Sequence, residues 1–269
     1  MDNVQLRTLT ILSILLAITL AIASFFGIFI TDTYERDTAS MAAQGIGQDI
    51  VNLFFVLPIL IISLVFIQRN SKMAWLIFSG TLLYIMYSFV IYCFGVNFNR
   101  MFLIYCATLG LSLYAFILAL IKLNSMDAGA WFEDGIPRRT IGIYLIVVAG
   151  LFYLLWLKDV VPAIIANTTP KTVSDYKVLV NPVHVTDMAF ALPGLIVSAW
   201  LLMKKKSMGY ILAPISLVFM MLLTVALAGM VIVVKMRGIA EDMSIAAIFL
   251  VIAVISALFL YRFLKHLKS

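Results

Sequence analysis

Two pairs of polar side chains interrupt long apolar stretches of this sequence, and each pair is spaced three residues apart. Asp49 and Asn52 form the first pair, and His184 and Asp187 form the second. Residues with this spacing lie on one face of a helix. Carboxylate, imidazole and amide groups presented together can bind a polar ligand or transfer protons. A Zn²⁺ site from Asp49, His184 and Asp187 would leave one open position, but the histidine-rich spacing of such sites is absent.

A second polar group follows the tyrosines that recur at helical spacing over residues 84–92. Arg100 stands beside asparagines at the end of this stretch, and it could pair with Asp49 or hold an anionic head group. No established catalytic motif accompanies these residues, so we assign no catalytic residue, no metal ligand and no cofactor. The candidate ligand-binding residues are Asp49, Asn52, Tyr92, Asn99, Arg100, His184 and Asp187.

The same residues also allow a purely structural interpretation. Asp49 and Asp187 could cap helices at the membrane interface, where an acidic side chain stabilises the N-terminus by about 0.3–1 kcal/mol. Tyr84 and Tyr87 could belong to an interfacial aromatic belt. Both interpretations stay open at the level of the sequence.

A proline follows each polar pair. Pro58 and Pro193 have no N–H, so each predicts a kink and an unpaired carbonyl in the preceding turn. Short helices interrupted by proline at matching positions in two halves of a chain point to a binding site.

The composition predicts the kind of secondary structure that holds these residues. The 269-residue chain is 64% apolar and 12% charged, with a mean hydropathy of +1.11. It has too little polar surface to cover a water-facing globule, which predicts an all-α integral membrane protein. The net charge of +6 therefore does not indicate a nucleic-acid partner, and the lipid bilayer is the expected surrounding. Two cysteines are too few for a disulfide scaffold.

Hydropathy predicts eight transmembrane helices, because each apolar run reaches the roughly 20 residues that cross a bilayer. The longer outer loops are expected at 31–49 and 159–183. The approximate limits of the spans are 8–30, 50–68, 73–95, 101–121, 140–158, 184–203, 209–234 and 243–263.

The basic residues predict the orientation. Most of the 19 lysines and arginines fall in segments on the side of the N-terminus, and such segments stay in the cytoplasm. An even number of spans returns the C-terminus to that side. We expect a multi-pass protein of the cell membrane with both termini cytoplasmic.

The two halves of the chain resemble each other. Residues 57–77 align without a gap to residues 192–212, and the alignment includes Pro58 with Pro193 and Ser63 with Ser198. The same offset of 135 positions pairs the two polar motifs described above. We therefore expect two parallel four-helix repeats, with residues 1–122 as the first, 123–139 as a cytoplasmic linker and 140–269 as the second.

Several short motifs resemble a family of multi-pass bacterial membrane proteins that carries no established activity. The resemblance would cover most of the chain, implies a bacterial cytoplasmic membrane, and assigns no role to any residue. The motifs are Gly47-x-Asp49, Leu57-Pro58, Tyr92-x-Phe94-Gly95-x-x-Phe98-Asn99, Pro182-x-His184-x-x-Asp187 and Gly209-Tyr210-x-x-Ala213-Pro214.

These patterns favour a protein that binds or transports a small molecule or lipid through an outward-facing site between its repeats. One alternative is a membrane-embedded enzyme that acts at the outer leaflet with an Asp/His cluster. Another is an accessory membrane subunit that offers helix faces to a partner. An enzyme requires members of the cluster to be in contact, whereas a subunit requires none of these contacts.

Overall fold

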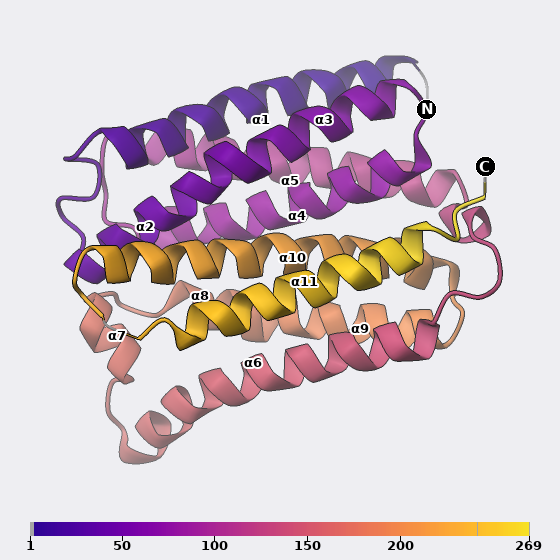
Figure 1. The fold of residues 1–269 in the computed structure, drawn as a ribbon. Coiled ribbons are helices and arrows are strands. Elements are labelled where there is room, and N and C mark those ends of the chain that lie inside the picture. Colours follow the sequence, from indigo (N-terminus) through magenta and orange to yellow (C-terminus); the bar gives the residue numbers. More distant parts are fainter. Residues whose placement is uncertain (1–2, 241, 269) are drawn as a thin grey trace.

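The computed structural model describes residues 3–240 and 242–268, and helices dominate it (Figure 1). Eight helical segments of this described chain are long and apolar enough to cross a membrane. The all-helical class is therefore confirmed, and the eight apolar helices are compatible with a multi-pass membrane protein. The elements are α1 (Asn3–Phe29), α2 (Ala39–Val51), η1 (Asn52–Val56), α3 (Leu57–Gln68), α4 (Lys72–Gly95), α5 (Phe102–Ser125), η2 (Ala128–Trp131), α6 (Arg138–Ala166), α7 (Lys171–Tyr176), α8 (Pro182–Thr186), η3 (Asp187–Ala191), α9 (Leu192–Met203), α10 (Ser207–Met236) and α11 (Ser244–Leu264).

The first predicted outer loop is shorter than expected. Residues 31–49 were expected to connect two spans, but α2 already begins at Ala39. Thr38 caps this helix, because its hydroxyl accepts a hydrogen bond from the backbone N–H of Met41 at 3.3 Å. The first turns of α2 are rich in small and polar residues, so hydropathy does not detect them.

The other long connections are also partly helical. In the predicted loop 159–183, α6 continues through Pro162 and the short helix α7 follows. The linker 123–139 contains the end of α5 and the 3-10 helix η2. The C-terminal tail packs on this linker, where Lys268 Nζ donates to the carbonyl of Ala130 at 2.9 Å.

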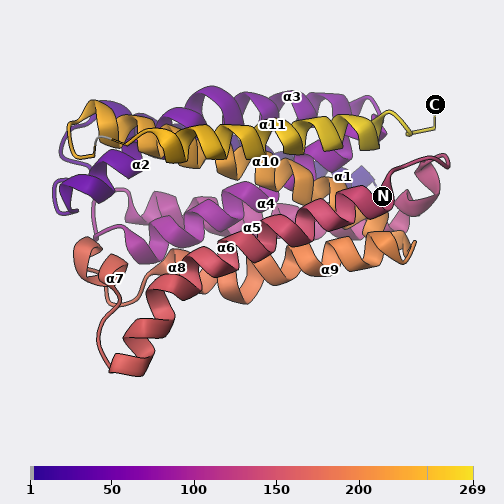
Figure 2. The same ribbon diagram turned by 60° about the horizontal axis from the view of Figure 1, so that its bottom comes forward.

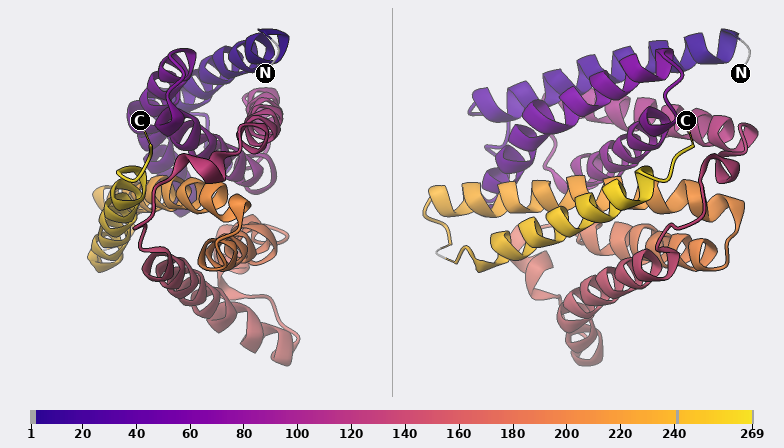
Figure 3. Two further views of the ribbon diagram at one scale, coloured as in Figure 1. Left: turned by 90° about the vertical axis from the view of Figure 1, so that its right-hand side faces the viewer. Right: turned by 45° about the vertical axis from the view of Figure 1, so that its right-hand side comes forward.

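The helices α4 and α10 form the centre of the molecule. Helix α10 packs against α2, α4, α9 and α11, and α4 packs against α3, α5, α8 and α10. The N-terminal helices α1–α5 lie in one half of the bundle and the C-terminal helices in the other (Figure 3). In the C-terminal half, α6 lies beside α9 (Figure 2). The described start of α1 and the end of α11 lie at the same end of the bundle (Figure 1).

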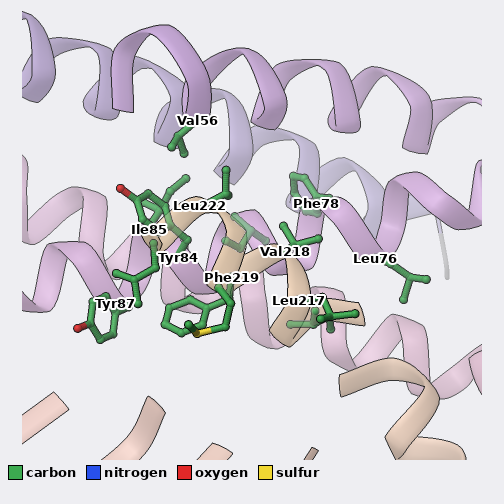
Figure 4. Close-up of a cluster of buried hydrophobic side chains, with 14 of the residues drawn as sticks. Val56, Leu76, Phe78, Tyr84, Ile85, Tyr87, Leu217, Val218, Phe219 and Leu222 are labelled. Carbon is green, nitrogen blue, oxygen red and sulfur yellow. The ribbon is translucent and has the colours of Figure 1, made fainter. Parts of the chain in front are cut away.

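Large buried side chains fill the space between α4 and α10. Tyr84, Tyr87, Val218 and Phe219 lie in this cluster (Figure 4), and all are at least 95% buried. A Cβ atom added to Gly80 would lie 2.5 Å from the Cβ of Val218. The two central helices can therefore approach closely only because position 80 has no side chain.

Two seams join the halves, and they differ in closeness. On one side α2 packs tightly along α10, where an added Cβ at Gly47 would meet the carbonyl oxygen of Gly229 at 2.6 Å. On the other side the short helix α8 meets the end of α4, and Pro182 lies against Gly95. The first seam is closed by backbone contact, whereas the second leaves room between the helices.

The closed seam predicts a difference between two glycines. Gly47→Val forces side-chain atoms into the backbone of α10, so we expect a loss of about 1–3 kcal/mol, typical of overpacking. Gly110→Val is the matched control, because a Cβ there meets nothing within 4 Å. Thermal unfolding of both purified variants in mild detergent measures the difference. Equal unfolding temperatures would contradict the tight α2–α10 contact.

Candidate functional site

Each polar pair continues into a π-helical turn, and a proline follows each turn. The backbone N–H of Leu57 bonds to the carbonyl of Asn52, and that of Leu192 bonds to the carbonyl of Asp187. These bonds reach back five residues, in place of the usual four. Pro58 and Pro193 cannot donate a hydrogen bond, and the expected distortion takes the form of a widened turn. Such turns are rare and frequent at functional sites.

Asp49 lies in the interior of α2 and is fully buried. Tyr34 Oη donates to its Oδ2 at 2.5 Å, and Tyr92 Oη donates to its Oδ1 at 2.8 Å. A Cβ added to Gly27 of α1 would collide with this carboxyl group. The interpretation of Asp49 as a helix cap is therefore wrong, since Thr38 caps α2.

Tyr34 lies outside the spans, in the connection between α1 and α2. Burial raises the pKa of Tyr34 well above its usual value, and the nearby Asp49 carboxylate raises it further. The phenol therefore remains protonated and acts as a donor.

Asn52 lies one turn beyond Asp49 and extends the same buried polar group. Its Oδ1 accepts a hydrogen bond from Tyr84 Oη at 3.0 Å. Its Nδ2 has no hydrogen-bond partner among the described residues, and the same holds for the hydroxyls of Ser24 and Ser88. This part of the interior therefore has spare hydrogen-bonding capacity.

Asp187 forms a separate group that ties the two halves together. Tyr87 Oη of α4 donates to its Oδ1 at 2.7 Å, and Trp156 Nε1 of α6 donates to its Oδ2 at 2.7 Å. Asp187 is 97% buried inside the continuous helix that begins at Pro182. It does not cap that helix either, because Asn181 accepts the N-terminal hydrogen bond from Val183.

His184 does not make the predicted contact with Asp49 or Asp187. Its ring lies against the indole of Trp156, with 4.8 Å between ring centroids. No ion pair or hydrogen bond joins it to either carboxylate among the described residues, and its buried Nε2 has no partner there. Both side chains contact Trp156, since the imidazole lies against the indole ring and the Asp187 carboxylate accepts a hydrogen bond from its Nε1.

Arg100 and Asn99 belong to a turn at the surface. Arg100 forms an ion pair with Asp32, not with Asp49 as one interpretation suggested. Asn99 Oδ1 accepts from the backbone N–H of Met101 at 2.8 Å, and its Nδ2 donates to Tyr105 at 3.4 Å. These contacts hold the turn that precedes α5. Neither Asn99 nor Arg100 forms a hydrogen bond or ion pair with Asp49.

The candidate residues therefore divide among separate places. Asp49, Asn52 and Tyr92 come together between α2 and α4, whereas His184 and Asp187 lie against α6. Among the described residues, no group of three His, Cys, Asp or Glu side chains could hold a metal ion. Tyr34 and Trp156 were not among the predicted site residues, and the sequence left open whether Tyr84 and Tyr87 belong to an interfacial belt; both donate to buried polar groups. The hydroxyl stripe at helical spacing on α4 was the available signal for the two inner tyrosines.

A cavity of about 1080 Å³ opens at the looser seam between the halves. Its walls are α4 and α5 on one side, and α8, η3, α9 and α10 on the other. The lining is mainly apolar. Tyr87 lies in this wall and donates to Asp187, and its ring packs edge-on against that of Phe219, another lining residue (Figure 4). The other polar lining side chains are Asn97, Lys177, Thr186, Ser198 and Ser216.

Comparisons with protein-family models, with curated proteins and with solved structures gave no match for this chain. The resemblance suggested by the short motifs thus stays an expectation.

The Tyr87–Asp187 hydrogen bond predicts a loss of stability when the hydroxyl is removed. Tyr87→Phe leaves one carboxylate oxygen without its donor, and we expect a loss of about 0.6–1.7 kcal/mol, the range of hydrogen bonds between membrane helices. Tyr114→Phe is the control, because that side chain on α5 is 62% exposed. Thermal or denaturant unfolding in detergent measures both. A loss no greater than that of the control would contradict a structural role for this bond.

Proposed function

We propose that this protein spans the cell membrane and binds a small molecule or lipid in the cavity between its two halves. The observation that carries the proposal is the cavity itself, which both halves line. Ligand sites are commonly 300–1,000 Å³ in volume, largely apolar, and furnished with a few polar groups that orient the ligand. This cavity reaches that size and has such a lining.

The separation of the polar groups favours binding over the enzymatic alternative. Acid–base catalysis by the predicted cluster requires Asp49 and His184 to meet at one substrate. Their partners are different, since Asp49 is enclosed by two phenols and His184 lies against Trp156. The carboxyl group adjoining the cavity wall is Asp187, reached through Tyr87.

A duplication of a four-helix unit would account for the cavity's place between the halves. The two π-helical turns begin at positions 52 and 187, which the repeat alignment pairs. The same offset relates the contact of Gly47 with Met230 to that of Pro182 with Gly95. It also relates α4 to α10, which pack against each other. We therefore retain residues 1–122 and 140–269 as proposed parallel repeats joined by a linker.

Transport would follow if the looser seam opens and closes. In two-repeat transporters one bundle rocks against the other around a fixed site. Here the α2–α10 seam is closed by glycine contacts, and the α4–α8 seam borders the cavity. The closed seam would act as the pivot and the open seam as the entrance.

Filling the cavity tests the binding proposal. Gly194 lines the cavity and an added Cβ there meets nothing within 4 Å, so Gly194→Phe should occupy the space without disturbing the helix packing. Phosphatidylcholine with a diazirine on its chain, incorporated into vesicles with the purified protein, should label cavity residues of the unmodified protein. We expect Gly194→Phe to lose most of this labelling.

The matched control is Gly150→Phe, since Gly150 is also free of contacts within 4 Å but does not line the cavity. It should label like the unmodified protein. Absence of cavity labelling, or labelling unaffected by Gly194→Phe, would overturn the proposal and favour the accessory-subunit alternative.

The proposed orientation predicts where two loops are accessible. Ala130→Cys lies before α6 and Thr169→Cys lies after it, so one long helix separates them. In a background without Cys93 and Cys106, an impermeant maleimide added to intact cells should label position 169 and spare position 130. Labelling of both positions from one side would contradict the eight-span topology.

A further inference from the structure

The cavity extends along the helix axes. Its lining on α4 extends from Leu83 to Gly95, which is about 18 Å at 1.5 Å per residue. On the opposite wall it extends from Pro182 to Ser198 along α8, η3 and α9. This length exceeds half of the roughly 30 Å hydrocarbon layer. An elongated chain fits this shape better than a compact ligand does.

The walls of the cavity are open to the surroundings of the helix bundle. Phe94, Phe98 and Phe190 line it and are 75%, 68% and 72% exposed. In a bilayer these side chains would face lipid chains. A chain of a membrane lipid could therefore enter from the side without crossing the aqueous phase.

Cationic side chains lie at one end of the cavity. Lys177 is part of the lining and ends helix α7 in a left-handed conformation, with a φ of 55°. Its ammonium group forms no ion pair among the described residues. Arg36 is not part of the lining itself, but its Nη1 donates to the carbonyl of the lining residue Phe98 at 3.0 Å.

One acidic residue, Asp37, is bonded to a lining residue at this end of the cavity. Asp37 Oδ1 accepts hydrogen bonds from the backbone and side chain of Asn97, both at 2.9 Å. Burial raises the pKa of Asp37, although the bonds from Asn97 oppose the shift. This end of the cavity thus has one cation in the lining, and one cation and one carboxyl group bonded to lining residues, so its charge suits an anion.

We propose that the cavity binds an anionic lipid of the bilayer, with its acyl chain along α4 and α9 and its head group at Lys177 and Arg36. This inference rests on the proposed function, and it adds the chemical class of the ligand. The cationic end and the apolar length together match a molecule that has one charged end and one long apolar part. Each basic residue near a membrane surface strengthens the binding of anionic lipid.

The test compares two lipids that differ only in the head group. Phosphatidylglycerol and phosphatidylcholine, each with a diazirine on the acyl chain, are incorporated separately into phosphatidylcholine vesicles that contain the full-length protein. Cross-linked peptides are then quantified by mass spectrometry. We expect phosphatidylglycerol to label the cavity more strongly, and the preference to weaken in high salt.

Two charge-removing variants and one control make the test specific. Lys177→Gln and Arg36→Gln should each reduce the preference for phosphatidylglycerol by about fivefold, whereas Lys177→Arg should retain it. Lys171→Gln is the control, because that exposed lysine pairs with Asp175 outside the cavity lining. Its preference should equal that of the unmodified protein.

The outcomes separate this inference from the binding proposal. Equal cavity labelling by both lipids, or an equal loss of preference in Lys171→Gln, would overturn the head-group assignment and leave lipid binding intact. Cavity labelling by neither lipid would overturn both proposals.

Discussion

Asp49 and Asp187, the two buried carboxyl groups of the described residues, both accept hydrogen bonds from hydroxyl groups of the same helix. Tyr92 of α4 donates to Asp49, and Tyr87 of α4 donates to Asp187. A hydrogen bond between membrane helices contributes about 0.6–1.7 kcal/mol, so moving α2 or η3 away from α4 costs stability. The central helix is thereby fixed to both halves, and the cavity wall that contains Tyr87 is fixed with it.

The α2–α10 contact and the α4–α8 contact differ in how closely the helices approach, because different residues lie at matching positions. Gly47 lets α2 approach the backbone of α10, and Gly229 supplies the matching space on the other helix. At the corresponding place in the second half, Pro182 begins α8 and lies against Gly95. A proline ring holds the helices apart where a hydrogen atom lets them touch. The cavity therefore forms on one side of the molecule and not at the tight seam.

The sequence predicts the eight long apolar helices well, because hydropathy is averaged over about 20 residues in each of them. Eight apolar runs gave the eight helices, and the two prolines marked the positions where the helices are distorted. The start of α2 was not readable, since its small and polar residues resemble a loop in hydropathy. Cap geometry at Thr38 decides that boundary.

The pairing of polar groups was harder to predict, because it depends on distances between helices. The spacing of Asp49 and Asn52 correctly placed them near each other in one group, but their donors come from residues far away in the chain. His184 and Asp187 share a helical spacing, yet Trp156 lies between their contacts. Arg100 was expected to pair with Asp49 or to hold an anionic head group, but it pairs with Asp32, which only the folded turn brings near.

The π-helical turns also settle the rotational phase of the helices that contain them. The buried positions Asp187 and Leu192 are five residues apart, and in a regular α-helix such a step would point them about 140° apart. The extra residue in the turn cancels much of that offset. Asp187 at the polar start of the helix and Leu192 in its apolar part consequently both face the protein interior. A regular α-helix with the same five-residue spacing would turn one of them away.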